Sequence, residues 1–170
     1  MCIIDGHENI AWNALTFGRD YTCSALTIRK AETSKSVLHH NGHASLGLKE
    51  WGEGGVGVIF AAIFVPPYRR STVDCYTHGY HNAEDAHQLA QAQLDYYHRL
   101  EDENPQFRII YDTGNLNAVV DTWRNDVEKD RQIGLVLLME GADPIREPQE
   151  VEYWAERGVR IIGPAWASTR

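Results

Sequence analysis

Two short segments of this 170-residue chain combine residue types that could bind a metal ion. The first covers residues 5–9, Asp-Gly-His-Glu-Asn, in which Asn9 follows His7 by two positions. Histidine is the commonest metal ligand near neutral pH, and an oxygen donor two positions further on can face the same ion from a strand end. A loop histidine held by hydrogen bonds is the alternative interpretation of the same motif.

The second segment is an apolar run that ends at an acidic residue. Residues 133–139 read Ile-Gly-Leu-Val-Leu-Leu-Met, and Glu140 and Gly141 follow directly. Apolar residues without alternation are typical of a strand that is buried on both faces of a parallel sheet. A carboxylate at the carboxyl end of such a strand lies where α/β proteins keep their active sites, although the first solvated residue of a loop would look the same.

The two segments form one site if the chain folds as a parallel sheet. The carboxyl ends of the strands of a parallel barrel all lie at one face. We therefore predict that His7, Asn9 and Glu140 lie close together at this face. The His7 ring and the Glu140 carboxylate should be within roughly 8 Å, because two bridged metal ions lie about 3.5–4 Å apart.

Segments typical of strands and of helices alternate along most of the chain. Short apolar runs predict strands over residues 1–4, 56–64, 107–111, 133–140 and 159–162. Apolar residues at helical spacing predict helices over residues 82–103, 116–127 and 148–158. The first of these helices should begin after Asn82, whose side chain can cap the free N–H groups of the first turn.

Residues 7–55 show a much weaker pattern, in which Asn, Gly, Ser and His recur. We predict a long loop here, with at most a helical turn or two over residues 44–51. Loops of this length are uncommon in compact domains and are usually functional or mobile. The loop contains His39, His40 and His43, which we interpret as solvated side chains rather than as metal ligands.

The alternation of strands and helices predicts an α/β fold with a parallel sheet. A doubly wound sheet could close on five strands within 170 residues, whereas a (β/α)8 barrel typically takes about 250 residues. The sequence stops soon after the fifth strand, without a segment that would form its covering helix. We expect residues 1–170 to form a single incomplete domain, in which strands and helices alternate over residues 56–163.

Composition and charge exclude several classes of function. The net charge of −8 and the absence of a basic stripe argue against nucleic-acid binding. No apolar run approaches the roughly 20 residues that span a bilayer, and the first residues do not resemble a signal peptide, so we expect a cytoplasmic protein. Cys2, Cys23 and Cys75 lie far apart and are interpreted as reduced structural thiols.

Four segments together resemble the membrane (renal) dipeptidase family of zinc peptidases, peptidase family M19. They are residues 5–12 (DGHENIAW), residues 54–60 (GGVGVIF) with 65–67 (VPP), residues 139–141 (MEG), and residues 158–162 (GVRII). The resemblance implies a partial (β/α)8 TIM barrel of the metal-dependent hydrolase type, comprising about the first five strands. It also implies hydrolysis of dipeptides at a site with two zinc ions.

Carried over residue by residue, the resemblance makes His7 the first metal ligand and Glu140 the catalytic carboxylate that bridges both ions. Asn9 stands where the family has an aspartate, and a neutral amide should hold zinc more weakly than a carboxylate does. Asp143 stands where the family has a histidine, so no substrate-binding residue is assigned. The family's remaining histidine ligands lie on later strands, and we therefore expect this chain alone to be weakly active or inactive.

Two other functions compete with a peptidase. One is a non-catalytic half-barrel that dimerises, or pairs with a second chain, to cover its open sheet edges. The other is a doubly wound protein that binds a phosphorylated ligand. The sequence argues against the second, because no strand is followed by a GxGxxG or GxxxxGK[ST] loop. The glycine-rich residues 52–57 precede their strand and are interpreted as a flexible loop entry.

Overall fold

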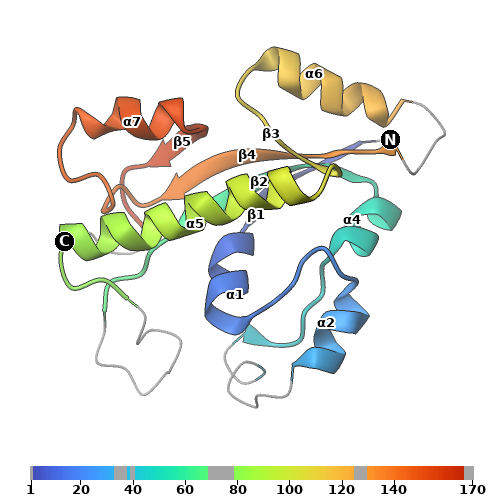
Figure 1. Ribbon diagram of the computed structural model, residues 1–170, viewed down its shortest axis with the longest axis horizontal. Coiled ribbons are helices and arrows are strands. Elements are labelled where there is room, and N and C mark those ends of the chain that lie inside the picture. Colours follow the sequence, from blue (N-terminus) through green and yellow to red (C-terminus); the bar gives the residue numbers. More distant parts are fainter. Residues whose placement is uncertain (1, 33–37, 39–40, 69–78, 125–129, 167–170) are drawn as a thin grey trace.

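The computed structural model describes residues 2–32, 38, 41–68, 79–124 and 130–166 (Figure 1). The elements are β1 (Ile3–Glu8), α1 (Ile10–Phe17), α2 (Ala25–Ala31), α4 (Leu48–Gly54), β2 (Val56–Phe64), α5 (Ala83–Glu103), β3 (Phe107–Ile109), α6 (Thr113–Thr122), β4 (Ile133–Glu140), α7 (Glu150–Glu156) and β5 (Val159–Gly163). Strands and helices alternate from β2 onward, and three helices lie between β1 and β2.

The five strands form one sheet, and every strand pairing among the described residues is parallel. This confirms the predicted α/β fold class. The order within the sheet is β1-β2-β4-β3, with β5 also paired to β4, and it differs from the sequential order expected of a barrel. β3 is only three residues long and pairs with the first part of β4, while β5 pairs with the last part. β3 and β5 thus share one edge of β4, and the other edge of β4 pairs along its length with β2.

Helix α5 covers the sheet as its longest helix (Figure 1). It begins where predicted, because the Asn82 side chain accepts a hydrogen bond from the Asp85 N–H at 3.0 Å. Its buried residues Ala86, Ala90, Leu94 and Tyr97 recur at a spacing of three and four along one face. They belong to the same apolar core as alternate residues of β2 and β4, which are Ile59, Ala61, Ile63, Ile133, Leu135, Leu137 and Met139.

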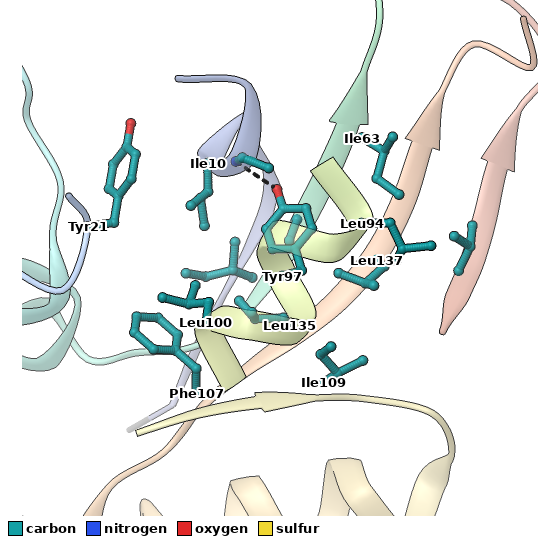
Figure 2. Close-up of a cluster of buried hydrophobic side chains, with 14 of the residues drawn as sticks. Ile10, Tyr21, Ile63, Leu94, Tyr97, Leu100, Phe107, Ile109, Leu135 and Leu137 are labelled. Atoms are coloured by element: carbon teal, nitrogen blue, oxygen red, sulfur yellow. Dashed lines mark hydrogen bonds between the residues drawn. The ribbon is translucent and has the colours of Figure 1, made fainter. Parts of the chain in front are cut away.

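Tyr97 joins three elements at the centre of this core (Figure 2). Its side chain is fully buried. The Tyr97 hydroxyl donates to the Ala62 carbonyl of β2 at 2.8 Å and accepts from the Ala11 N–H of α1 at 3.2 Å. α1 is thereby fixed against the sheet directly after the His7 motif.

The prediction of a long loop over residues 7–55 is wrong. Three short helices, α1, α2 and α4, occupy much of this region. Local signals mark two of their ends: the Ser24 side chain accepts from the Thr27 N–H at the start of α2, and Gly18 ends α1 in the left-handed conformation with φ 69°. Each helix has only seven or eight residues, which is too short for a clear apolar period.

The other predicted elements are present, with shifted ends. β1 continues to Glu8, so that His7 lies within the strand rather than after it. β3 stops at Ile109, and α7 begins at Glu150, two residues after Pro148. α6 ends at Thr122, and the predicted continuation to residue 127 falls partly on residues outside the described ones.

Two properties predicted from composition can be checked on the described part of the chain. None of the helices there is both long and apolar enough to cross a membrane. Cys2 and Cys23 carry free thiols, while Cys75 lies outside the described residues.

Candidate metal centre

His7 and Glu140 meet at the carboxyl edge of the sheet. β1 and β4 both run parallel to β2 and lie on either side of it, so their carboxyl ends lie at the same edge. The Nε2 atom of His7 lies 3.1 Å from the Oε2 atom of Glu140. The Glu140 side chain is 22% exposed and that of His7 is 42% exposed, so the pair remains open to solvent.

Asn9 lies beside this pair at the N-cap position of α1. Its Nδ2 atom is 3.4 Å from the His7 Nε2 atom. A half turn of the amide exchanges Nδ2 and Oδ1 and brings the oxygen to the same side as the imidazole. The backbone carbonyl of Asn9 accepts from the Asn13 Nδ2 group at 2.7 Å, which holds the residue in place. The three side chains named from the sequence therefore lie together.

The backbone around His7 is held by a neighbouring carboxylate. The Asp5 side chain accepts a hydrogen bond from the His7 N–H at 3.0 Å. The register between β1 and β2 is irregular between Asp5 and Glu8. Asp5 therefore supports the irregular end of the strand from which the His7 ring projects.

The end of β4 is positioned by its neighbours. Glu140 pairs with Phe64 of β2 and with Gly163 of β5. The buried Gln93 side chain binds both backbone groups of Phe64: it accepts from the N–H at 2.9 Å and donates to the carbonyl at 2.6 Å. Gly141 then adopts a φ of 96°, a conformation that glycine allows and that turns the chain away from the sheet.

Glu8 is a buried carboxyl group that the sequence analysis did not single out. It accepts a hydrogen bond from the Trp51 Nε1–H at 2.9 Å. Burial raises the pKa of Glu8 to about 8, against the opposing effect of the Trp51 hydrogen bond and with a smaller rise from Asp5. The strand period could have indicated it, because successive side chains of a strand point to opposite faces and His7 faces solvent.

The family to which the chain belongs follows from a comparison of its sequence with known families. The model of the membrane dipeptidase family, peptidase family M19, matches residues 1–170. This chain belongs to the membrane dipeptidase family. One relative of this M19 chain is an uncharacterized protein in the PQQ-III 3′ region of Acinetobacter calcoaceticus. The two are 29% identical over 145 residues, which cover 77% of this chain and 41% of the relative.

Solved structures share the fold of the M19 chain at 18% sequence identity. Dipeptidase AC, a family M19 metallopeptidase, has a TM-score of 0.59, with 98% of this chain and 43% of that chain covered. A metallopeptidase from Rhodobacter sphaeroides, liganded with a phosphinate mimic of the dipeptide L-Ala-D-Ala, has a TM-score of 0.62, with 98% and 46% covered. The probable dipeptidase PvdM from Pseudomonas aeruginosa has a TM-score of 0.64, with 97% and 34% covered.

The M19 chain spans less than half the length of each of these relatives. Its five-stranded parallel sheet and flanking helices correspond to part of the barrel expected from the sequence.

The donor set of the M19 chain fits a cation in part. Within the described residues, Asn9 Oδ1 and Glu140 Oε2 are buried atoms that accept no hydrogen bond, and Glu140 Oε2 has the His7 Nε2 atom as its ionic partner at 3.1 Å. A carboxylate oxygen 3.1 Å from an imidazole nitrogen suits a metal ion, and a half turn of the Asn9 amide would add a third donor. No group of three or more His, Cys, Asp or Glu side chains in the same described part forms a metal site. The set is thus one imidazole, one carboxylate and one amide.

The predicted loop before α4 contains three histidines, at positions 39, 40 and 43. His39 and His40 lie outside the described residues. His43 is exposed and lines a cavity that His7 and Asn9 also line. The exposure of His43 agrees with its interpretation as a solvated side chain.

Proposed function

We propose that this chain supplies part of a zinc site that hydrolyses dipeptides. The single observation that carries the proposal is the 3.1 Å separation of His7 Nε2 and Glu140 Oε2 at the carboxyl edge of the sheet. Membership of the M19 family provides the reaction class. The dipeptide substrate is proposed by analogy with relatives, one of which has been crystallised with a dipeptide mimic.

Each of the three proposed ligands has a distinct part. His7 offers Nε2, the ring nitrogen nearest to Glu140. Glu140 offers a carboxylate that could bridge two ions, and Asn9 offers a neutral oxygen. Bound zinc would lower the pKa of a coordinated water and polarise the scissile carbonyl. Asp5 and Gln93 hold the two strand ends in place through backbone hydrogen bonds.

These residues alone should support only weak catalysis. A catalytic zinc ion normally has three protein ligands and a water, and a site with two ions needs more donors than the three seen here. Asn9 adds no negative charge to offset the repulsion between two cations. Weak zinc binding with little or no dipeptide turnover is therefore the expected behaviour of these 170 residues.

A calorimetric zinc titration with a parallel assay of dipeptide hydrolysis tests the proposed function. His7→Ala and Glu140→Gln should each weaken zinc binding by at least about 100-fold, since even outer-shell changes cost 10–100-fold. His98→Ala is the matched control, because this histidine contacts the Arg157 carbonyl at the α5–α7 contact. Zinc binding that is equal in the wild type and His7→Ala would contradict the proposal.

The second candidate is a non-catalytic half-barrel that dimerises or pairs with another chain. Exposed apolar side chains on the two outer strands favour it: Ile4 of β1 is 60% exposed and Ile161 of β5 is 41% exposed. Among the described residues, each of these strands pairs on one side only. Sedimentation velocity should then show an assembly that the Ile4→Lys and Ile161→Lys variants weaken. A wild-type monomer at all concentrations would exclude self-association.

A further inference from the structure

The chain that follows Glu140 forms a compact turn over residues 141–145. The Ile145 N–H donates to the carbonyl three residues earlier at 3.0 Å. The Asp143 side chain folds back toward the strand, because an atom at the Cβ position of Gly141 would lie 3.3 Å from Asp143 Oδ2. Asp143 is itself buried, at 7% exposed. The 141–145 turn is therefore packed directly against the end of β4, where the proposed metal ligand lies.

A histidine of α5 binds this turn. The Nδ1 atom of His87 lies 3.1 Å from the carbonyl oxygen of Pro144, which is a buried residue. A carbonyl oxygen can only accept a hydrogen bond, so the Nδ1 atom carries the hydrogen and donates it. Glu150 Oε2 of α7 lies 3.7 Å from the same nitrogen. The side chain of His87 thus joins α5 to the segment that connects β4 with α7.

The orientation of the His87 ring is fixed by α7. The ring centroid lies 5.2 Å from that of Trp154, at an interplanar angle of 66°, and 6.1 Å from that of Tyr153, at 26°. Trp154 is fully buried, and the His87 side chain is only 13% exposed. Packing locks the rotamer of a side chain, and a hydrogen bond from a locked side chain restrains its acceptor more than one from a mobile surface group does.

We propose that His87 is a positioning residue of the candidate metal centre. Its hydrogen bond to Pro144 holds the 141–145 turn, and the turn holds the Glu140 carboxylate in the orientation that binds zinc. The supports described above act on the ends of β1 and β2, whereas His87 acts on the chain after β4. A ligand that loses an outer support binds its metal more weakly even though every donor atom remains. The inference rests on the proposed zinc site and adds a residue to it.

Two variants separate the hydrogen bond of His87 from the packing of its ring. His87→Asn keeps an N–H donor near the position of Nδ1 and loses the ring, whereas His87→Phe keeps a ring against α7 and loses the donor. In a calorimetric zinc titration, we expect His87→Phe to bind about tenfold more weakly than the wild type and His87→Asn to stay within about threefold of it. A purely structural role predicts the reverse order, because the asparagine variant loses more packing.

A control variant and a second measurement accompany the titration. His98→Phe is the matched control, because His98 lies on the same helix and its Nε2 atom contacts the Arg157 carbonyl at 3.0 Å. Its zinc affinity should stay within about threefold of the wild type. Amide hydrogen exchange on the zinc-free proteins follows the turn itself: the Ile145 N–H should exchange faster in His87→Phe than in the wild type, His87→Asn and His98→Phe.

The inference and the proposed function fail in different ways. Equal zinc affinity in His87→Phe and the wild type would overturn the inference alone, as would an equal loss in His87→Asn or in His98→Phe. Unchanged exchange of the Ile145 N–H in His87→Phe would also overturn it, whether or not zinc binds. Zinc binding that is independent of His7 would contradict the proposed function. A wild type that binds no zinc would contradict both.

Discussion

The imidazole of His7 and the carboxylate of Glu140 are 3.1 Å apart, although they close the first and fourth strands of the chain. Parallel pairing of both strands with β2 produces this contact, since it places their carboxyl ends at one edge. The Asn9 amide completes the group from the N-cap position of α1. The contact is therefore a property of the sheet topology rather than of a local motif.

The first prediction concerns Asn9, the neutral member of this group. Asn9→Asp adds a negative charge next to His7, and we expect zinc binding to become about tenfold tighter, because zinc gains more from a carboxylate than from an amide. Calorimetry on both proteins measures the change. Dipeptide turnover by these residues should stay low, since the number of ligands is unchanged. Unchanged zinc affinity would show that residue 9 does not contact the ion.

The long elements were the part of the fold that the sequence predicted well. β2 and β4 have the predicted bounds, and α5 begins after its Asn82 cap. The two strands are long enough to show an unbroken apolar run, and the helix is long enough to show its period and its cap. The helices between residues 7 and 55 escaped prediction because each is too short to show an apolar period, and α1 is also held by a distant contact, that of the Tyr97 hydroxyl with the Ala11 N–H.

The strand order could not be predicted from patterns along the chain. It depends on which strand is long enough to pair with β2, and β3 has only three residues. The candidate site was predictable in part, since His7, Asn9 and Glu140 stand in recognisable motifs. The cavity beside it, which Arg19 also lines, was not, because Arg19 and Glu32 pair across a turn and a helix that carry no motif.

A second prediction concerns Tyr97 and the stability of the core. Tyr97→Phe removes both hydrogen bonds of the hydroxyl and leaves the Ala62 carbonyl and the Ala11 N–H unpaired in a buried place. We expect the free energy of unfolding to fall by about 1–3 kcal/mol. Urea unfolding measures it. The neighbouring Tyr96→Phe is the control and should change stability by less than about 0.5 kcal/mol, because Tyr96 is only partly buried.

A third prediction concerns the buried ion pair of Arg19 and Glu32. Arg19→Met leaves the Glu32 carboxylate buried without its cation, and we expect a loss of about 3–5 kcal/mol in the free energy of unfolding. The double variant Arg19→Met with Glu32→Met should recover much of this loss, because it removes the uncompensated charge as well. Denaturant titration of the single and double variants measures these changes in the free energy of unfolding. A double variant less stable than the single one would show that the pair contributes through its geometry instead.

The last prediction is a pH dependence that arises between α5 and α7. Arg146 binds Glu84 at 2.6 Å and Glu150 at 2.7 Å, and these hydrogen bonds hold the pKa values of Glu84 and Glu150 below their usual value of 4.5. A carboxyl group whose pKa is lowered on folding stabilises the protein above its unfolded pKa, and the contribution is lost as the pH falls through the folded pKa.

Arg146→Ala should accordingly be less stable than the wild type at neutral pH, and the difference between the two proteins should shrink as the pH falls below 4.5. Thermal unfolding across this range measures it, and added salt should also reduce the difference because Arg146 and Glu84 are exposed. Lys49→Ala is the control: it breaks an exposed pair with Glu53 at 3.7 Å that lies on a single helix and should matter less at any pH. A difference for Arg146→Ala that persists undiminished at low pH would mean that Arg146 stabilises the α5–α7 contact through packing rather than charge.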